Sequence, residues 1–188
     1  MTRDRPAAGE IAIPPSREFR SLPPEQQRKI ESCLGEVPVK LGPLARSLGV
    51  QVRLATLPRN ISGQLGREDG GFVIRINRHE AKGRQRFTLA HQLAHFLLHR
   101  DRIVDGEPWE ENVLLRSDQP THVENEANRL AFDLVIPPAG LARIRAGYSI
   151  LTTQAIEELA FRFGLTKVVM EDRLEMLERH CHAGGTPH

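Results

Sequence analysis

One short stretch constrains the fold of this chain most strongly: RQRFTLAHQLAHFLLH, from Arg84 to His99. Apolar residues cover most of the circumference of a helix from about Lys82 to His99, a pattern typical of a buried helix rather than a surface helix. Residues four apart lie on the same side of a helix, so His91, His95 and His99 form one column. The first two imidazoles can therefore converge on a common point.

Two neutral imidazoles at this spacing offer nitrogen lone pairs in a geometry that zinc accepts. A zinc centre needs at least one further protein ligand, and a catalytic centre also keeps one position open. The spacing alone does not decide the matter, because two histidines on a helix are more often polar residues satisfied by ordinary hydrogen bonds.

A second helix favours the metal site. The segment VENEANRLAFDLVIPP, residues 123–138, has its apolar residues on one face and ends at a proline pair. Glu124 lies nearer the centre of that face than Glu126 does. A carboxylate directed at a core is costly unless it is paired or binds a metal. The simpler alternative is that Glu124, in the first turn, stabilises the helix dipole.

Shorter patterns predict the remaining elements. We expect a flexible arm over residues 1–24, one domain over residues 25–178 and a flexible tail over residues 179–188. A small antiparallel sheet should precede the histidine helix, with a hairpin turn between its last two strands. The expected helices are 23–33 and 38–48, the latter ended by Gly49, and the expected strands are 50–54, 61–65 and 72–76.

The run from Thr152 to Leu177 resembles a helix-turn-helix, with Gly164 at the turn. Its second helix carries Glu171, Asp172 and Glu175, which makes it poorly suited to approach DNA phosphates. We therefore expect this part to pack on the rest of the domain and do not expect direct DNA binding.

Composition excludes several classes of partner. Lysine and arginine total 26 against 24 acidic residues, and a formal charge of +2 gives no strong electrostatic reason to bind nucleic acid or an anionic membrane. Cys33 and Cys181 lie far apart, so a disulfide framework is not expected. No segment has the length and apolarity of a signal peptide or a membrane span. We expect a soluble cytoplasmic protein, and the sequence leaves its oligomeric state open.

Three motifs together resemble the ImmA/IrrE family of zinc-dependent endopeptidases, over roughly Val37 to Leu177. They are the histidine run, the later ENEANRLAFDLVIP, and LPRNISGQL followed by GGFVIRINR. The resemblance implies a zincin-like α+β fold in a bacterial protein of transcription regulation and stress response. It also implies that the substrate is a helix-turn-helix repressor, whose cleavage derepresses genes.

By this resemblance His91, His95 and Glu124 correspond to the metal ligands, with Glu126 as the alternative third ligand. The implied metal is Zn²⁺, although such ligands also accept Mn²⁺ or Fe²⁺.

The chain departs from the family pattern at Gln92, where a glutamate is expected, and at Ala94, where glycine is commoner. The glutamate would act as general base, and a glutamine amide has no oxygen basic enough for that role. Loss of one general base costs on the order of 10²–10⁴-fold in rate. We expect a chain that binds zinc and substrate but hydrolyses very slowly.

Two origins of Gln92 fit this pattern: a glutamate replaced in this chain, which we favour, or a natural pseudoenzyme. The alternative function is a non-catalytic zinc module that sequesters a helix-turn-helix partner.

Other residues have predicted supporting roles. Tyr148, His122 and His99 are candidates to stabilise the oxyanion or to support a ligand, and Asn128 is a candidate to orient Glu124. An extended substrate is expected to pair as an added strand with one predicted strand. That strand consists of Phe72, Val73, Ile74, Arg75, Ile76 and Asn77.

Overall fold

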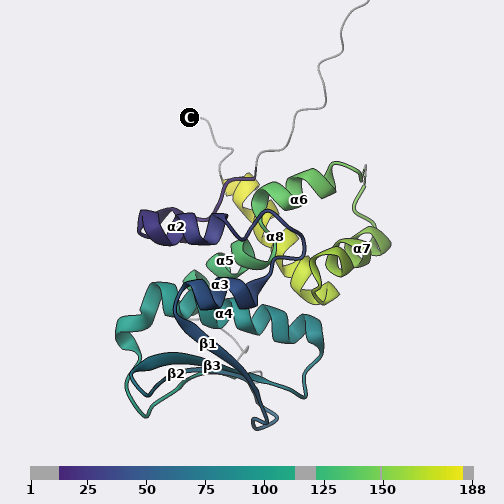
Figure 1. Cartoon of the computed structure of the whole chain (residues 1–188). Helices are drawn as coiled ribbons and strands as arrows, with labels where there is room; N and C mark the ends of the chain where they lie inside the picture. Colours follow the sequence, from purple (N-terminus) through teal and green to yellow (C-terminus); the bar gives the residue numbers. More distant parts are fainter. Residues whose placement is uncertain (1–12, 113–121, 149, 184–188) are drawn as a thin grey trace, which may run out of the picture.

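The computed structural model describes residues 13–112, 122–148 and 150–183. Within them, a four-stranded sheet covers one side of the long helix α4 (Lys82–His99), and the other helices gather on the opposite side (Figure 1). Helix α5 (His122–Val135) packs along α4, on the side away from the sheet. The α+β class predicted from the sequence is confirmed, and α4 has the predicted bounds.

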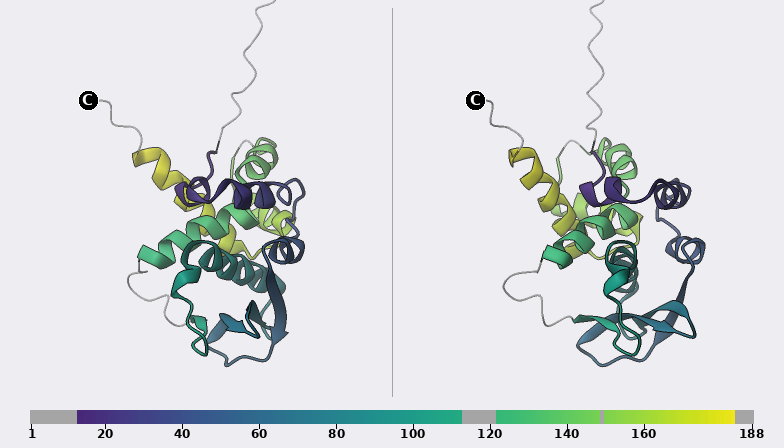
Figure 2. Two further views of the ribbon diagram at one scale, coloured as in Figure 1. Left: turned by 60° about the vertical axis from the view of Figure 1, so that its left-hand side comes forward. Right: turned by 90° about the vertical axis from the view of Figure 1, so that its left-hand side faces the viewer.

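The remaining helices surround this centre and are mostly short. Figure 2 shows these helices together at one end of the molecule and the sheet at the opposite end. Their bounds are α1 (Arg17–Ser21), α2 (Pro24–Glu31), α3 (Leu41–Ser47), the 3₁₀ helix η1 (Arg100–Arg102), α6 (Pro138–Arg145), α7 (Thr153–Phe163) and α8 (Lys167–Ala183).

The sheet has the strand order β1-β3-β2-β4. Its strands are β1 (Val50–Ala55), β2 (Ile61–Glu68), β3 (Gly71–Asn77) and β4 (Trp109–Asn112). The predicted hairpin joins β2 to β3 through Asp69 and Gly70, whose φ angles of 49° and 77° suit a two-residue turn of the Asp-Gly type. However, β1 pairs with β3 in parallel, so the prediction of an antiparallel sheet is wrong for this pair.

The N-terminal segment is folded from α1 onward. The Ser16 hydroxyl caps α1 by accepting a hydrogen bond from the Phe19 N–H at 3.1 Å, and the side chains of Phe19 and Leu22 are buried. The prediction of a flexible arm over residues 1–24 is therefore wrong for this part, because two apolar side chains anchor a helix of only five residues. Residues 1–12 of the predicted arm lie outside the described residues.

The C-terminal helices pack on the rest of the domain. Gly164 separates α7 from α8 with a φ of 66°, and the side chains of Phe163 and Met170 are fully buried. A Cβ atom placed on Gly83, in the first turn of α4, would lie only 2.7 Å from the backbone nitrogen of Thr166. The turn between α7 and α8 therefore lies directly against the start of α4, which agrees with the predicted packing of this part on the rest of the domain.

Helix α8 is longer than predicted. It continues through residue 183, so the tail predicted over residues 179–188 is helical over its first part, and residues 184–188 lie outside the described residues. Inside the domain, Arg173 of α8 donates to the Asp133 carboxylate of α5 at 2.8 Å. The same carboxylate accepts the Ser16 backbone N–H at 2.7 Å, which joins α1, α5 and α8 at one buried point.

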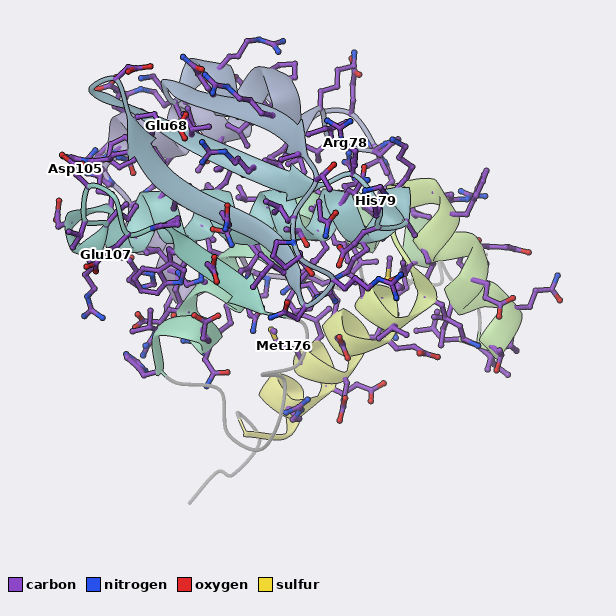
Figure 3. All side chains as sticks on the ribbon, turned by 90° about the horizontal axis from the view of Figure 1, so that it is seen from below. Glu68, Arg78, His79, Asp105, Glu107 and Met176 are labelled. Atoms are coloured by element: carbon purple, nitrogen blue, oxygen red, sulfur yellow. The ribbon has the colours of Figure 1, made fainter. Side chains whose placement is uncertain are left out.

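The face of the sheet away from α4 carries no described helix. Figure 3 views this face directly and shows Glu68 along the sheet, Arg78 and His79 at one end, and Asp105 and Glu107 in the loop before β4. In the described part of the chain, no helix is both long and apolar enough to cross a membrane.

Candidate metal centre

The site is built on the histidine column of α4. His91 and His95 are almost fully buried, with exposed fractions of 4% and 0%, and their rings meet edge to face with 4.6 Å between centroids. The two Nε2 atoms lie 3.0 Å apart. The four-residue spacing on a buried helix thus directs two imidazole nitrogens at one point, as the sequence pattern predicted.

Glu124 of α5 completes this group of nitrogen and oxygen atoms. Its Oε2 lies 3.1 Å from the His91 Nε2, and its Oε1 lies 3.4 Å from the His95 Nε2. Zinc bonds of 2.0–2.1 Å in a tetrahedron place neighbouring ligand atoms about 3.3 Å apart. The three separations in the site, 3.0 Å to 3.4 Å, are therefore those that a tetrahedral ion imposes on its ligands.

Gln92 supplies an independent test of the fit between these residues and a metal. Its side chain is fully buried, yet among the described residues neither its Oε1 nor its Nε2 has a hydrogen-bond partner. Buried amides are almost always satisfied in folded proteins, by protein groups or by ordered water. A buried amide without a partner, directly after the ligand candidate His91 in the sequence, fits a site that holds an ion and its water.

The electrostatics of the site favour the metal-binding forms of its ligands. Burial is the main cause that lowers the pKa of His95 to about 4, so its imidazole is neutral at neutral pH. Burial acts to raise the pKa of Glu124, but its contacts with the imidazoles of His91 and His95 outweigh it and hold that pKa well below its usual range. A neutral imidazole and an ionised carboxylate are the forms in which these groups bind cations.

Comparison with known proteins decides the family. Residues 45–175 match the model of the IrrE N-terminal-like domain of peptidase family M78. The chain belongs to this M78 family. No curated protein matches it in sequence.

Among solved structures, a Mycobacterium tuberculosis transcriptional regulator is similar to this M78 chain, with a TM-score of 0.54 and 19% sequence identity. The match covers 80% of the M78 chain but only 45% of the regulator, so the chain spans less than half of that protein's length. This likeness establishes a shared fold.

Trp109 of β4 lies against the histidine column, and the sequence analysis missed this contact. Its ring lies over His95, with 4.7 Å between centroids, and stacks on His99 at 6.1 Å with an interplanar angle of 13°. The 3₁₀ helix and a loop separate β4 from α4 in the sequence. Periodicity within α4 therefore could not reveal the contact, although a lone tryptophan shortly after the histidine helix was a usable hint.

Gly63 of β2 is a second residue that the sequence analysis missed. A Cβ atom at this position would lie 2.6 Å from the Thr88 Cγ2 and 3.5 Å from the Gln92 Cγ. The sheet thus approaches α4 closely at Thr88 and Gln92, and it can do so because position 63 has no side chain.

Several predicted site residues lie elsewhere or have other partners. The Tyr148 hydroxyl donates to Glu158 at 3.0 Å, away from the histidine column. His122 is exposed and contacts Glu126. The orienting role of Asn128 toward Glu124 stays a prediction. Glu126, the alternative third ligand, contacts His99 and is absent from the group around His91.

The predicted substrate strand is wrong. All six residues, Phe72 to Asn77, belong to β3, which pairs with β1 on one side and with β2 on the other. A strand with both edges occupied cannot accept an added strand. Asn77 has a structural role instead, because its Nδ2 donates to the carbonyl oxygen of Ile61 at 2.9 Å.

Proposed function

We propose that this chain is the zinc-binding domain of an M78 endopeptidase that recognises a helix-turn-helix repressor, and that Gln92 disables its hydrolytic step. The observation that carries the proposal is the convergence of His91, His95 and Glu124 within 4.8 Å of one another, with the buried amide of Gln92 directly after His91 in the sequence. Membership of a peptidase family supports the reaction class. A cytoplasmic location goes with a substrate of this kind.

The ligands in this proposal are the Nε2 atoms of His91 and His95 and the carboxylate of Glu124. Zinc, when bound, supplies Lewis-acid chemistry for a peptide carbonyl and for a water molecule. A glutamate at position 92 would take a proton from that water on its carboxylate oxygen and deliver it to the leaving amine. The Gln92 amide has the shape of that group, but its Oε1 is not basic enough to accept the proton.

The substrate segment belongs, in this proposal, along β4 rather than β3. Among the described residues, β4 pairs only with β2, so its other edge is available to an extended peptide. Trp109 on β4 contacts His95, which brings this edge next to the metal ligands.

The experiment compares the chain with its Gln92→Glu variant. Each is purified and its bound zinc is quantified. Each is then incubated, with and without a chelator, with the helix-turn-helix regulator that is encoded next to it. We expect about one zinc in both, and cleavage at least 10²-fold faster in the glutamate form. His91→Ala in the Gln92→Glu background is the matched control, because it keeps the base and removes a ligand.

Two other outcomes lead to different conclusions. Zinc in both forms with cleavage in neither, while the regulator stays bound, would favour the alternative function, a module that sequesters its partner. The specific observation in favour of that alternative is Gln92 itself. Absence of zinc from both forms would contradict the metal site.

A further inference from the structure

His99 continues the histidine column but does not belong to the proposed ligand group. It is buried, with an exposed fraction of 6%, and it lies between His95 and Glu126. Its Nδ1 is 3.2 Å from the Nδ1 of His95, and its Nε2 is 3.2 Å from the Oε2 of Glu126. A series of polar contacts therefore runs from the Glu126 carboxylate through His99 to the Nδ1 of His95. The Nε2 of His95, on the other side of its ring, faces His91 and Glu124.

When the rings of His95 and His99 are both neutral, the donors and acceptors in this series of contacts can be arranged in only one way. An ionised carboxylate only accepts, so the Nε2 of His99 must carry the hydrogen that it donates to Glu126. The Nδ1 of His99 is then an acceptor, and the Nδ1 of His95 must donate to it. The lone pair of His95 is left on its Nε2, the atom that faces His91 and Glu124.

Other groups hold the Glu126 end of this series of contacts in place. The second carboxylate oxygen of Glu126, Oε1, accepts from His122 at 2.6 Å and from Arg17 of α1 at 3.4 Å. These contacts leave Oε2 directed at His99. Trp109 stacks on the His99 ring and so restrains the plane in which both of its nitrogens lie.

We propose that His99 and Glu126 are positioning residues that hold His95 in the Nδ1–H tautomer, so that its Nε2 lone pair is available to the metal. This inference rests on the proposed function for the identity of the site, but the tautomer itself can be measured without any metal. Groups that orient a metal-binding histidine in this way are worth about 10–100-fold in metal affinity.

The test combines two measurements on the full chain. Long-range ¹H–¹⁵N correlation spectra of the metal-free protein at neutral pH report which nitrogen of His95 carries the hydrogen. Zinc affinity is measured by competition with a chromogenic chelator. We expect the Nδ1–H form of His95 in the unaltered chain. His99→Phe, which keeps an aromatic ring against Trp109, should lose that form and bind zinc about 10–100-fold more weakly.

Matched variants separate positioning from packing. His99→Asn can place its Oδ1 where Nδ1 stood and still accept from His95, so we expect it to recover most of the affinity that His99→Phe loses. Glu126→Gln should weaken zinc binding in the same direction as His99→Phe. Lys29→Met, which removes a surface ion pair with Glu25, should leave the affinity unchanged. Thermal melts confirm that each variant is folded, and the asparagine and glutamine variants carry the test if His99→Phe does not fold.

The outcomes distinguish this inference from the proposed function. An Nε2–H tautomer of His95 in the unaltered chain would overturn the inference whether or not zinc binds. Equal zinc affinity in the His99→Phe and unaltered chains would overturn it as well. The expected tautomer without any zinc binding would instead overturn the proposed function and leave the positioning arrangement intact.

Discussion

At position 92, a fully buried amide follows His91 on α4 and has no hydrogen-bond partner among the described residues. Seven residues earlier on the same helix, Gln85 is also buried, but its Nε2 donates to the carbonyl oxygens of Asn77, Arg78 and Glu80. Both glutamine side chains are therefore buried, but only the amide of Gln85 has hydrogen-bond partners among the described residues. Replacing each amide by an apolar side chain should therefore change the free energy of unfolding in opposite directions.

We expect Gln92→Met to raise the free energy of unfolding of the metal-free chain by about 1–3 kcal/mol, because it removes an unsatisfied buried polar group at nearly constant volume. Gln85→Met is the matched control and should lower it, since three carbonyl oxygens lose a donor. Urea unfolding in the presence of a chelator measures both. A destabilised Gln92→Met variant would show that the amide has a partner in solution.

Residues of one helix could be predicted from the sequence, and residues brought together from different elements could not. The column of His91, His95 and His99 follows from local periodicity. The contact of Trp109 with this column depends on where β4 pairs in the sheet, which is a contact between elements. The separate contacts of Glu124 and Glu126 depend on how α5 crosses α4, and helix phase alone left both as possible ligands.

At the scale of elements, β2 and α4 are fitted together at Gly63. The predicted hairpin between β2 and β3 was confirmed because Asp-Gly turns have a strong local preference. The parallel pairing of β1 with β3 and the central place of β3 were not predicted, because strand order is set by long-range packing that no short pattern encodes.

We expect Gly63→Ala to destabilise the fold by about 1–3 kcal/mol, because its Cβ would lie 2.6 Å from the Thr88 Cγ2 and 3.2 Å from the Arg75 carbonyl oxygen. Replacing Thr88 by serine in the same chain should recover part of the loss, since it removes the closer atom. Gly35→Ala, where no atom lies within 4 Å of the new Cβ, is the control. Equal chemical-denaturation midpoints for the alanine variants at positions 63 and 35 would contradict this packing.

Across the whole molecule, the N-terminal helix is held to α5 by charge. The Oε1 of Glu18, in α1, accepts from Arg129 and from Arg17 at 2.8 Å each, and its side chain is only 4% exposed. Burial acts to raise the pKa of Glu18, but these hydrogen bonds outweigh it and hold the pKa below its usual value of 4.5. A carboxylate with a depressed pKa in the folded state stabilises the fold above its unfolded pKa, and that contribution is lost as pH falls through the folded pKa.

We expect the difference in unfolding free energy between the unaltered chain and Glu18→Gln to be largest near pH 7 and to shrink as pH falls below about 4.5. Denaturant titrations at intervals from pH 7 to about pH 3 measure this difference. Glu25→Gln is the control, because the Glu25 side chain is 72% exposed and forms a surface ion pair with Lys29. A difference that stays constant with pH would mean that Glu18 acts through packing alone.

The proposed ligands come from two helices, α4 and α5, which face each other across the centre of the domain. An ion held by both is a cross-link that the unfolded chain lacks, so folding and metal supply become thermodynamically linked. A free zinc concentration 100-fold above the dissociation constant would add about 2.7 kcal/mol to the stability of the domain. Changes in zinc availability would then alter how much of the protein is folded, and therefore how much can engage its partner.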